Sequence, residues 1–245
     1  MPCQDPDYFD VPLAKLTAKG YARERFSNFD PKKASRSSDI GAGTWPEESP
    51  QTTHYSVMDK WGNGVALTTT LNSGYGNKIV AEGTGILLNN EMDDFSAKRD
   101  TANQFGLLGR EANSIEPGKR MLSSMSPTIV TKGGKPFLLT GSPGGSTIIT
   151  TTLQVIVNVI DHQMPIHKAV SAPRFHHQWM PDAIWHGPGG IPEAALSELE
   201  KMGHENISQR FSRGIGDANS ILYDAESGTI YGMKDPRSEG AAVGF

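Results

Sequence analysis

The sequence predicts a layered α+β fold, in which strands and helices occupy separate runs of the chain. Two observations predict it. Alternating segments between residues 53 and 140 pair naturally into β-hairpins, and two helical segments follow before strands return near residue 220. The faces of such sheets must be covered, and the apolar helix expected after Ser146 is suited to that position.

The length and composition of the chain set limits on its class. Its 245 residues suffice for one large or two small domains, and 36% apolar with 20% charged residues is typical of a soluble globular protein. A net charge of −4 without a Lys/Arg run argues against nucleic acid as a partner. No apolar run is long enough to span a membrane, and no apolar export segment is visible. The single Cys3 excludes an intrachain disulfide framework and a cysteine-based metal cluster.

Residues 1–51 differ in composition from the rest of the chain. Val11–Gly20 is expected to form a short helix closed by Gly20, with further helical turns over Tyr21–Phe29. Residues 31–51 are rich in Ser, Pro, Gly and Lys, which predicts an exposed loop. Exposed and poorly packed backbone is where a chain can be cut.

The next segments predict two hairpins separated by a long loop. Thr53–Met58 and Val65–Leu71 flank a Gly-containing turn, and residues 127–131 and 136–140 flank a second turn. Residues 98–114 carry no regular pattern. Long loops of this kind are often lids.

Helices dominate the following stretch. The helix expected at Thr147–His162 is apolar nearly all round, which predicts that it is buried. A second helix is predicted from Pro192 to Met202 and ends at Gly203. Strands at Ser220–Tyr223 and Thr229–Tyr231 complete the pattern.

Thr52 is the first candidate for chemistry. If the chain is cut between Gln51 and Thr52, the new α-amino group becomes a base on the same residue as the nucleophilic hydroxyl. Such an amine has a pKa of about 7.7–8.0, so it can accept the hydroxyl proton near neutral pH. The simpler interpretation is that adjacent threonines begin a strand.

Thr70 and an acidic segment are the next candidates. In the first hairpin Thr70 lies on the strand paired with the one that Thr52 begins, so its hydroxyl could orient that of Thr52. Glu91 and Asp94 share a face of a helical turn and could hold a substrate ammonium group. An ordinary strand threonine and a solvated acidic turn remain the alternatives.

Two further segments could bind oxygen atoms. Paired hydroxyls at Ser123 and Ser124 could bind a carboxylate, although a plain loop also fits. The Gly-rich run 141–146 before a helix suits an oxyanion hole. Phosphate binding is the rival interpretation, but the glycine spacing matches neither common nucleotide motif. The adjacent pair His176–His177 points to opposite faces of a strand and is interpreted as structural.

Together these segments resemble the γ-glutamyltranspeptidase family. The resemblance is carried by Thr52–Ser56, 87–97, 122–128, 140–146, 172–179 and 235–238. It implies an N-terminal-nucleophile hydrolase fold, an αββα sandwich that is incomplete here because most of the large subunit is absent. Residues 52–245 would be the small-subunit catalytic domain, and residues 1–51 the end of the large subunit with the cleavage site.

The resemblance also implies roles for single residues. Thr52 is the nucleophile in self-cleavage and in γ-glutamyl ester formation, and Thr70 supports it. The substrate's amino end is held by Asn72, Glu91 and Asp94, and its α-carboxylate by Ser123 and Ser124. Gly144 and Gly145 offer N–H groups to the oxyanion. The substrate would be a γ-glutamyl compound such as glutathione and the acceptor water, an amino acid or a peptide, with no metal or organic cofactor.

Two departures from the family pattern limit these expectations. Phe105 stands where many bacterial members carry a lid tyrosine, and a phenyl ring covers a pocket without donating a hydrogen bond. The missing large-subunit region implies a separate partner chain, or else an inactive fragment that acts at most as a binding chain. The family is commonly periplasmic or extracellular, but this chain itself indicates no compartment.

Overall fold

The structure is a computed structural model that describes residues 5–8, 10–40, 52–96, 111–179 and 181–244. Near the N-terminus it contains helices α1 (Leu13–Leu16), α2 (Lys19–Phe26) and α3 (Ser37–Ile40). The expectation that Gly20 closes a helix is wrong, because Gly20 lies inside α2. The break between the first two helices falls instead at Thr17 and Ala18, where Ala18 is extended.

The first predicted hairpin is confirmed. Strands β1 (Thr52–Met58) and β2 (Gly64–Thr70) form a two-stranded antiparallel sheet, and the register pairs Thr52 with Thr70. His54 is buried on one face of β1, whereas Tyr55 and Val57 are exposed. The strand therefore has one face against the protein and one face open in the described part of the chain.

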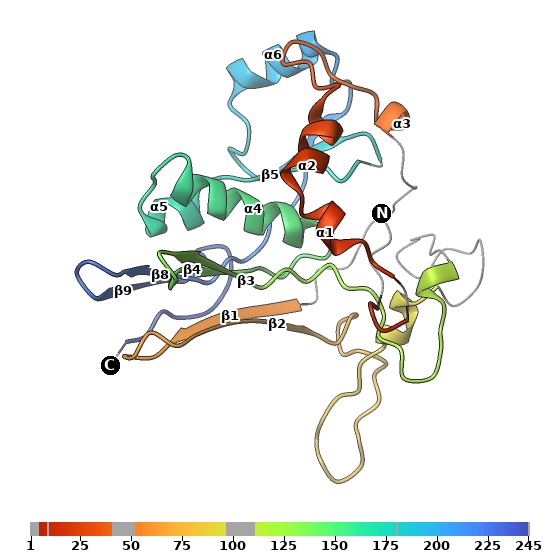
Figure 1. Ribbon diagram of the computed structural model, residues 1–245, viewed down its shortest axis with the longest axis vertical. Coiled ribbons are helices and arrows are strands. Elements are labelled where there is room, and N and C mark those ends of the chain that lie inside the picture. Colours follow the sequence, from red (N-terminus) through yellow and green to blue (C-terminus); the bar gives the residue numbers. More distant parts are fainter. Residues whose placement is uncertain (1–4, 9, 41–51, 97–110, 180, 245) are drawn as a thin grey trace.

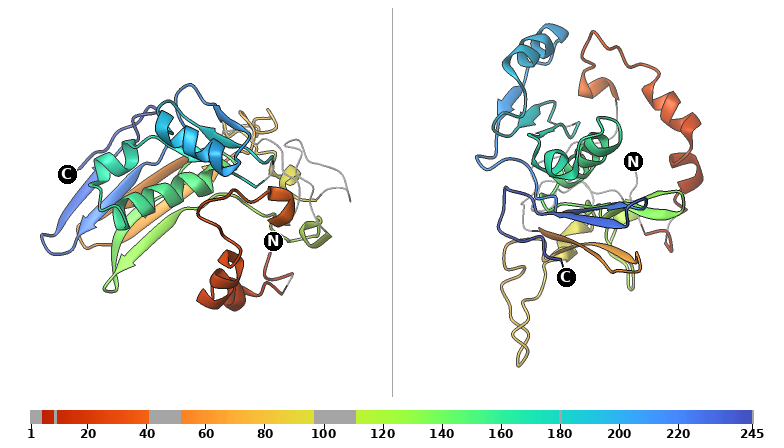
Figure 2. Two further views of the ribbon diagram at one scale, coloured as in Figure 1. Left: turned by 90° about the horizontal axis from the view of Figure 1, so that it is seen from above. Right: turned by 90° about the vertical axis from the view of Figure 1, so that its left-hand side faces the viewer.

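The second hairpin is also confirmed and belongs to a larger sheet. Its strands β3 (Thr128–Lys132) and β4 (Lys135–Thr140) are joined by β8 (Ser220–Asp224) and β9 (Thr229–Met233) in the order β3-β4-β8-β9. Figure 2 shows the two-stranded sheet lying beneath this four-stranded sheet. They touch closely, since a Cβ on Gly64 would meet the side chain of Leu139.

Helices α4 (Thr147–Ile160) and α5 (Ile166–Ser171) cover the other face of the four-stranded sheet (Figure 2). The main core lies between them and contains Leu138, Val155, Val159, Ile166, Ala169, Val170 and Ala218. The predicted helix at 147–162 is confirmed, but its burial on all sides is not. Ile149, Leu153 and Ile160 are exposed on the far side of α4.

A third sheet was not predicted. Strands β5 (Phe175–His176), β6 (Ile184–His186) and β7 (Ile207–Gln209) are two or three residues long, too short to show an alternating pattern. Helix α6 (Glu193–Met202) connects β6 and β7 and ends as predicted, with Gly203 in the left-handed conformation at φ 101°.

Two 3₁₀ helices, η1 (Glu91–Asp94) and η2 (Glu111–Asn113), complete the described elements. Figure 1 shows η1 at the end of the sheets where β1 begins. The N-terminal segment contacts the body at two distant places. Its Ser37 accepts a bond from the indole of Trp179 at 2.6 Å, and its Tyr8 hydroxyl donates to the carbonyl of Pro117 at 2.7 Å.

Candidate active site

The candidate nucleophile lies at the first position of β1. Thr52 is half-buried and pairs with Thr70 across the hairpin. The Thr70 hydroxyl accepts the backbone N–H of Asn72 at 2.9 Å, which fixes that oxygen at the end of β2. The predicted juxtaposition of Thr52 and Thr70 is therefore present.

Asparagine side chains attach the acidic turn to the end of β2. Asn72 has a left-handed backbone (φ 70°), and its side-chain amide donates to the carbonyl of Asn90 at 3.4 Å. Asn90 in turn accepts the N–H of Ser73 at 2.9 Å and donates to its hydroxyl at 3.1 Å. Because Asn90 directly precedes η1, these bonds hold Glu91 close to the end of the strand that carries Thr70.

Two of the three carboxylates of η1, those of Glu91 and Asp94, are partly withdrawn from water. Burial raises the pKa of Glu91 above its ordinary value. Burial, together with the negative charges of Glu91 and Asp93, raises the pKa of Asp94 to about 6. Both carboxylates are half-buried, so this turn differs from the fully solvated acidic turn that the sequence left as an alternative.

Asn113 connects the acidic turn to the paired serines. Its buried side chain donates to the carbonyl of Asp94 at 2.7 Å and accepts the N–H of Leu122 at 3.1 Å. Ser123 and Ser124 come directly after Leu122, and the exposed Ser123 hydroxyl accepts the N–H of Met125 at 3.1 Å. Sequence reasoning missed Asn113, which it assigned to the lid-like loop. Phe105, the predicted lid residue, lies outside the described residues.

The Gly-rich run forms the entry to α4. Gly144 and Gly145 have φ angles of 131° and 56°, a region that glycine enters readily. The carbonyl of Gly144 accepts both the N–H and the hydroxyl of Thr147, at 3.0 and 2.8 Å. The turn is thereby fixed at the positive end of a fourteen-residue helix.

His54 connects β1 to the Gly-rich run. Its ring occupies the space that a Cβ on Gly141 would need. Its two nitrogens lie 2.8 Å from the hydroxyl of Thr68 and 3.2 Å from that of Ser56. Burial lowers the pKa of His54 to about 4, so the ring is neutral near pH 7. Its role is to join β1 to the Gly-rich run, and sequence reasoning had assigned it none.

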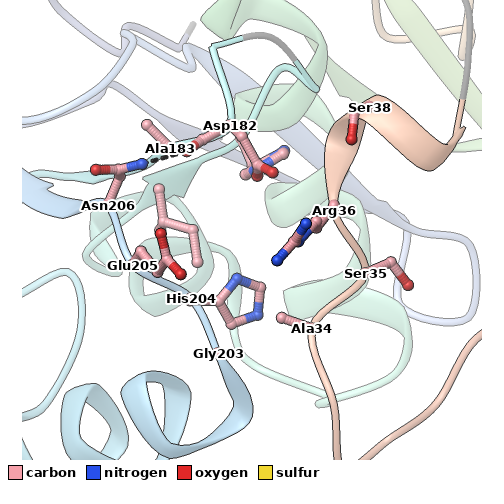
Figure 3. A pocket seen from close by; sticks show the side chains of 12 residues that line it. Ala34, Ser35, Arg36, Ser38, Asp182, Ala183, Gly203, His204, Glu205 and Asn206 are labelled. Atoms are coloured by element: carbon pink, nitrogen blue, oxygen red, sulfur yellow. Dashed lines mark hydrogen bonds and ion pairs between the residues drawn. The ribbon is translucent and has the colours of Figure 1, made fainter.

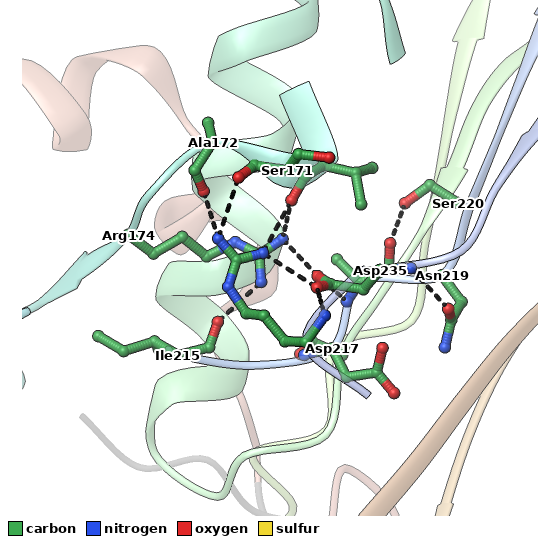
Figure 4. A network of polar contacts seen from close by, with 12 residues as sticks. Ser171, Ala172, Arg174, Ile215, Asp217, Asn219, Ser220 and Asp235 are labelled. Carbon is green, nitrogen blue, oxygen red and sulfur yellow. Dashed lines mark hydrogen bonds and ion pairs between the residues drawn. The ribbon is translucent and has the colours of Figure 1, made fainter. Parts of the chain in front are cut away.

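Figure 4 shows a buried network of charged groups around Asp235. The Asp235 carboxylate accepts a bond from Arg174 at 2.7 Å, one from Arg237 at 2.9 Å and the N–H of Ala218 at 2.9 Å. Burial would raise the pKa of Asp235, but the positive charges of Arg174 and Arg237 and the donated hydrogen bonds lower it below its ordinary value.

This network holds the segment that contacts the Gly-rich run. Arg174 also donates to the carbonyl of Ile215 at 2.7 Å. Two residues further on, the N–H of Asp217 donates to the hydroxyl of Ser142 at 2.8 Å. The sequence motifs around Arg174 and Asp235 therefore fix the segment 215–217, which in turn contacts Ser142 of the Gly-rich run.

The pocket shown in Figure 3 lies elsewhere. It has a volume of about 350 Å³ and is enclosed by the N-terminal segment near Arg36 and by residues around β6 and the end of α6. It is lined by none of the predicted site residues. Within the described ranges, no group of three His, Cys, Asp or Glu residues could hold a metal ion. Among the described helices, none combines the length and the apolar character that a membrane span requires.

The chain matches the sequence profile of the family described as gamma-glutamyltranspeptidase over residues 2–245. It is 51% identical to the glutathione hydrolase proenzyme of Escherichia coli over 235 residues, which are 96% of this chain and 40% of that protein. The chain thus spans about two fifths of the length of this curated relative.

Solved structures are similar as well. A chain of a Helicobacter pylori γ-glutamyltranspeptidase variant superposes with a TM-score of 0.70 at 53% identity, over 76% of this chain and 100% of that chain. The Pseudomonas nitroreducens enzyme, complexed with L-DON, gives a TM-score of 0.70 at 44% identity, over 79% of this chain and 99% of that one.

Proposed function

The chain belongs to the γ-glutamyltranspeptidase family, and on that premise we propose that it carries the catalytic centre of a γ-glutamyl hydrolase or transferase whose nucleophile is Thr52. The observation that carries the proposal is the placement of Thr52 at the start of β1. There it faces Thr70 in the register, and the contacts of Asn72 and Asn90 bring the acidic turn to the same end of the hairpin.

The proposed reaction begins with cleavage of the 51–52 bond. The Thr52 hydroxyl attacks the carbonyl carbon of Gln51, the chain shifts to an ester on that oxygen, and water hydrolyses the ester. Gln51 becomes a carboxylate and Thr52 gains a free α-amine. The relative in Escherichia coli is named a proenzyme, which supports a processed chain.

Acyl transfer then uses the same hydroxyl. It attacks the γ-carbonyl carbon of the donor while its proton passes to the α-amine, and the N–H groups of Gly144 and Gly145 stabilise the oxyanion. The C–N bond breaks, the leaving amine takes the proton, and a γ-glutamyl ester remains on Thr52. Water or an amino acid then attacks the ester and restores the hydroxyl.

The charges of the site suit a γ-glutamyl donor. Its ammonium group is proposed to bind Asn72, Glu91 and Asp94, and its α-carboxylate the hydroxyls of Ser123 and Ser124. The raised pKa of Asp94, about 6, still leaves that carboxylate ionised near neutral pH. Glutathione, with a γ-glutamyl amide, belongs to this class of donor.

We further propose that the whole protein forms an αββα sandwich of which this chain supplies the inner layers and one helical layer. The open face of the β1–β2 sheet carries Tyr55, Val57 and Val65, each about half exposed. Aligned apolar side chains on one sheet face favour a covering layer. Residues 52–245 are 194 of 245 residues, or 79% of the chain, and the Pseudomonas nitroreducens chain matches 79% of this chain over 99% of its own length. That agreement supports a boundary near Thr52.

The proposal is tested with γ-glutamyl-p-nitroanilide, from which transfer or hydrolysis releases coloured p-nitroaniline. The chain is assayed alone and after co-expression with the additional region of the Escherichia coli relative. We expect p-nitroaniline to be released by the unsubstituted chain and by the neighbouring control Thr53→Ala, and not by Thr52→Ala. Absence of release from both preparations favours the second candidate, an inactive fragment, which the open apolar sheet face supports.

A further inference from the structure

The beginning of the described chain lies against the loop that leads to Ser123 and Ser124. Figure 1 shows this N-terminal segment beside the region of η1 and η2. The Asp5 carboxylate accepts the backbone N–H of Arg120 at 2.8 Å and a guanidinium N–H of the same residue at 2.5 Å. These partners are 115 residues apart and lie on opposite sides of the proposed cleavage site.

This contact differs from an ordinary surface ion pair. The Asp5 side chain is only 1% exposed, and its carboxylate also accepts the N–H of Asp7 at 3.2 Å. The Arg120 side chain lowers the pKa of Asp5 to about 2, so the carboxylate stays ionised in ordinary buffers. Because one of the bonds comes from the backbone of Arg120, Asp5 fixes the path of the main chain there.

Tyr8 extends the same contact. Its hydroxyl donates to the carbonyl of Pro117 at 2.7 Å, and the ammonium of Lys119 lies 5.6 Å from the centre of its ring. Residues 5–8 therefore hold the loop 117–120 through a buried carboxylate and a phenol.

The same loop is held from its other side. Asn113 accepts the N–H of Leu122, so Arg120 and Leu122 are fixed by different elements on either side of Met121. Ser123 and Ser124 follow immediately. Ser123 follows Arg120 by only three residues of backbone, so the bonds at Arg120 and Leu122 together restrict where the two serines can lie.

We propose that Asp5 is a positioning residue for the donor site, and that Asp5 and Tyr8 keep their hold on the loop after the 51–52 bond is cut. By fixing Arg120, Asp5 sets where Ser123 and Ser124 present their hydroxyls to the donor carboxylate. The inference rests on the proposed function for the role of the serines. The ordering of the loop by Asp5 is independent of it.

The test compares Asp5→Asn with Asp7→Asn in the full chain. Both aspartates contact the Arg120 guanidinium, but Asp7 is exposed and holds no backbone group of the loop. The asparagine at position 5 keeps the size of the side chain while its amide brings N–H donors toward the donors of Arg120. Amide hydrogen exchange of peptides within 111–126 reports loop ordering, and KM and kcat for γ-glutamyl-p-nitroanilide report donor binding and chemistry.

For Asp5→Asn we expect exchange in the loop to rise by about tenfold, with β3 and β4 unchanged. We also expect KM to rise roughly five- to tenfold, with kcat within about twofold. Asp7→Asn should change neither quantity by more than about twofold. Should Asp5→Asn fail to fold, Tyr8→Phe is measured instead, because it removes the hydrogen bond to the carbonyl of Pro117 in the same loop. We expect KM and the exchange of the loop amides each to rise by about threefold.

These outcomes distinguish the positioning role of Asp5 from the proposed function. Unchanged loop exchange in Asp5→Asn overturns the inference whatever the activity. Faster exchange with unchanged KM overturns the positioning role. A wild-type chain without turnover, prepared with the additional region of its relative, counts against the proposed function, while the exchange result still decides whether Asp5 orders the loop.

Discussion

Replacing Asp235 with asparagine is expected to destabilise the protein by about 3–5 kcal/mol. The Asp235 side chain has no exposed surface, and its partner Arg174 is 1% exposed at 2.7 Å. The substitution removes the negative charge and leaves the buried Arg174 guanidinium without its ion-pair partner; the carboxylate of Asp217 remains as a weaker electrostatic neighbour. The amide oxygen can replace one carboxylate oxygen, but the amide nitrogen then faces the N–H donors of the other. Those donors belong to Arg237 at the Oδ1 position, or to Arg174 and Ala218 at the Oδ2 position.

Urea unfolding followed by tryptophan fluorescence at pH 7 measures this loss. Glu198→Gln is the matched control, since it breaks an ion pair with Lys201 in which both side chains are more than 60% exposed. That pair should be worth about 0–1 kcal/mol. If Asp235→Asn unfolds with a free energy within about 1 kcal/mol of the wild-type protein, the reasoning that this network anchors residues 215–219 is refuted.

Three further predictions follow from the site. The pKa of His54 is lowered to about 4, so between pH 6.5 and 4 the unfolded chain takes up this proton and the folded protein does not. The free energy of unfolding should therefore fall by about 2 kcal/mol over this range, and His54→Gln should lack this fall; urea midpoints measure both. Asp94, with its pKa raised to about 6, loses its charge below that pH, so kcat/KM for the anilide should decline on acidification, and Asp94→Asn should flatten this profile at a value at least about tenfold lower. Asn113→Ala removes two hydrogen bonds, one from the Asn113 side chain to the carbonyl of Asp94 and one from the N–H of Leu122 to that side chain. In the same assay KM should rise by about tenfold, more than kcat falls.

The parts of the fold that sequence alone predicted have strong local signals. The hairpin after Thr52 alternates and turns through Gly-containing residues, and α6 ends at a glycine that adopts the left-handed conformation. The sheet β5–β7 had no such signal, because its strands are too short for a periodic pattern and are defined by pairing over long sequence distances. The outer face of α4 appeared buried because apolar residues surround the helix, yet Leu153 is exposed in the described part of the chain.

The residues of the candidate site likewise form two groups, one that the sequence predicted and one that it did not. Thr52, Thr70 and the acidic pair could be proposed from residue type and spacing, and the structure brings their segments together. His54, Asn113 and Asp5 could not be predicted, because their importance comes from contacts between segments that sequence does not place side by side. For a histidine, an asparagine or an aspartate, a single sequence does not indicate which distant groups the side chain will contact. The assignment of catalytic and binding roles to these residues stays a prediction.

The most direct measurement concerns residue 52 itself. Intact mass spectrometry and N-terminal labelling of the purified chain, prepared with the additional region of its relative, determine whether a free α-amine begins at Thr52. We predict a fragment that starts at Thr52, carries the γ-glutamyl group after brief incubation with donor, and is not formed in Thr52→Ala. A chain that remains uncut yet turns over the donor, or a donor adduct on another residue, would contradict the claim that Thr52 supplies both nucleophile and base.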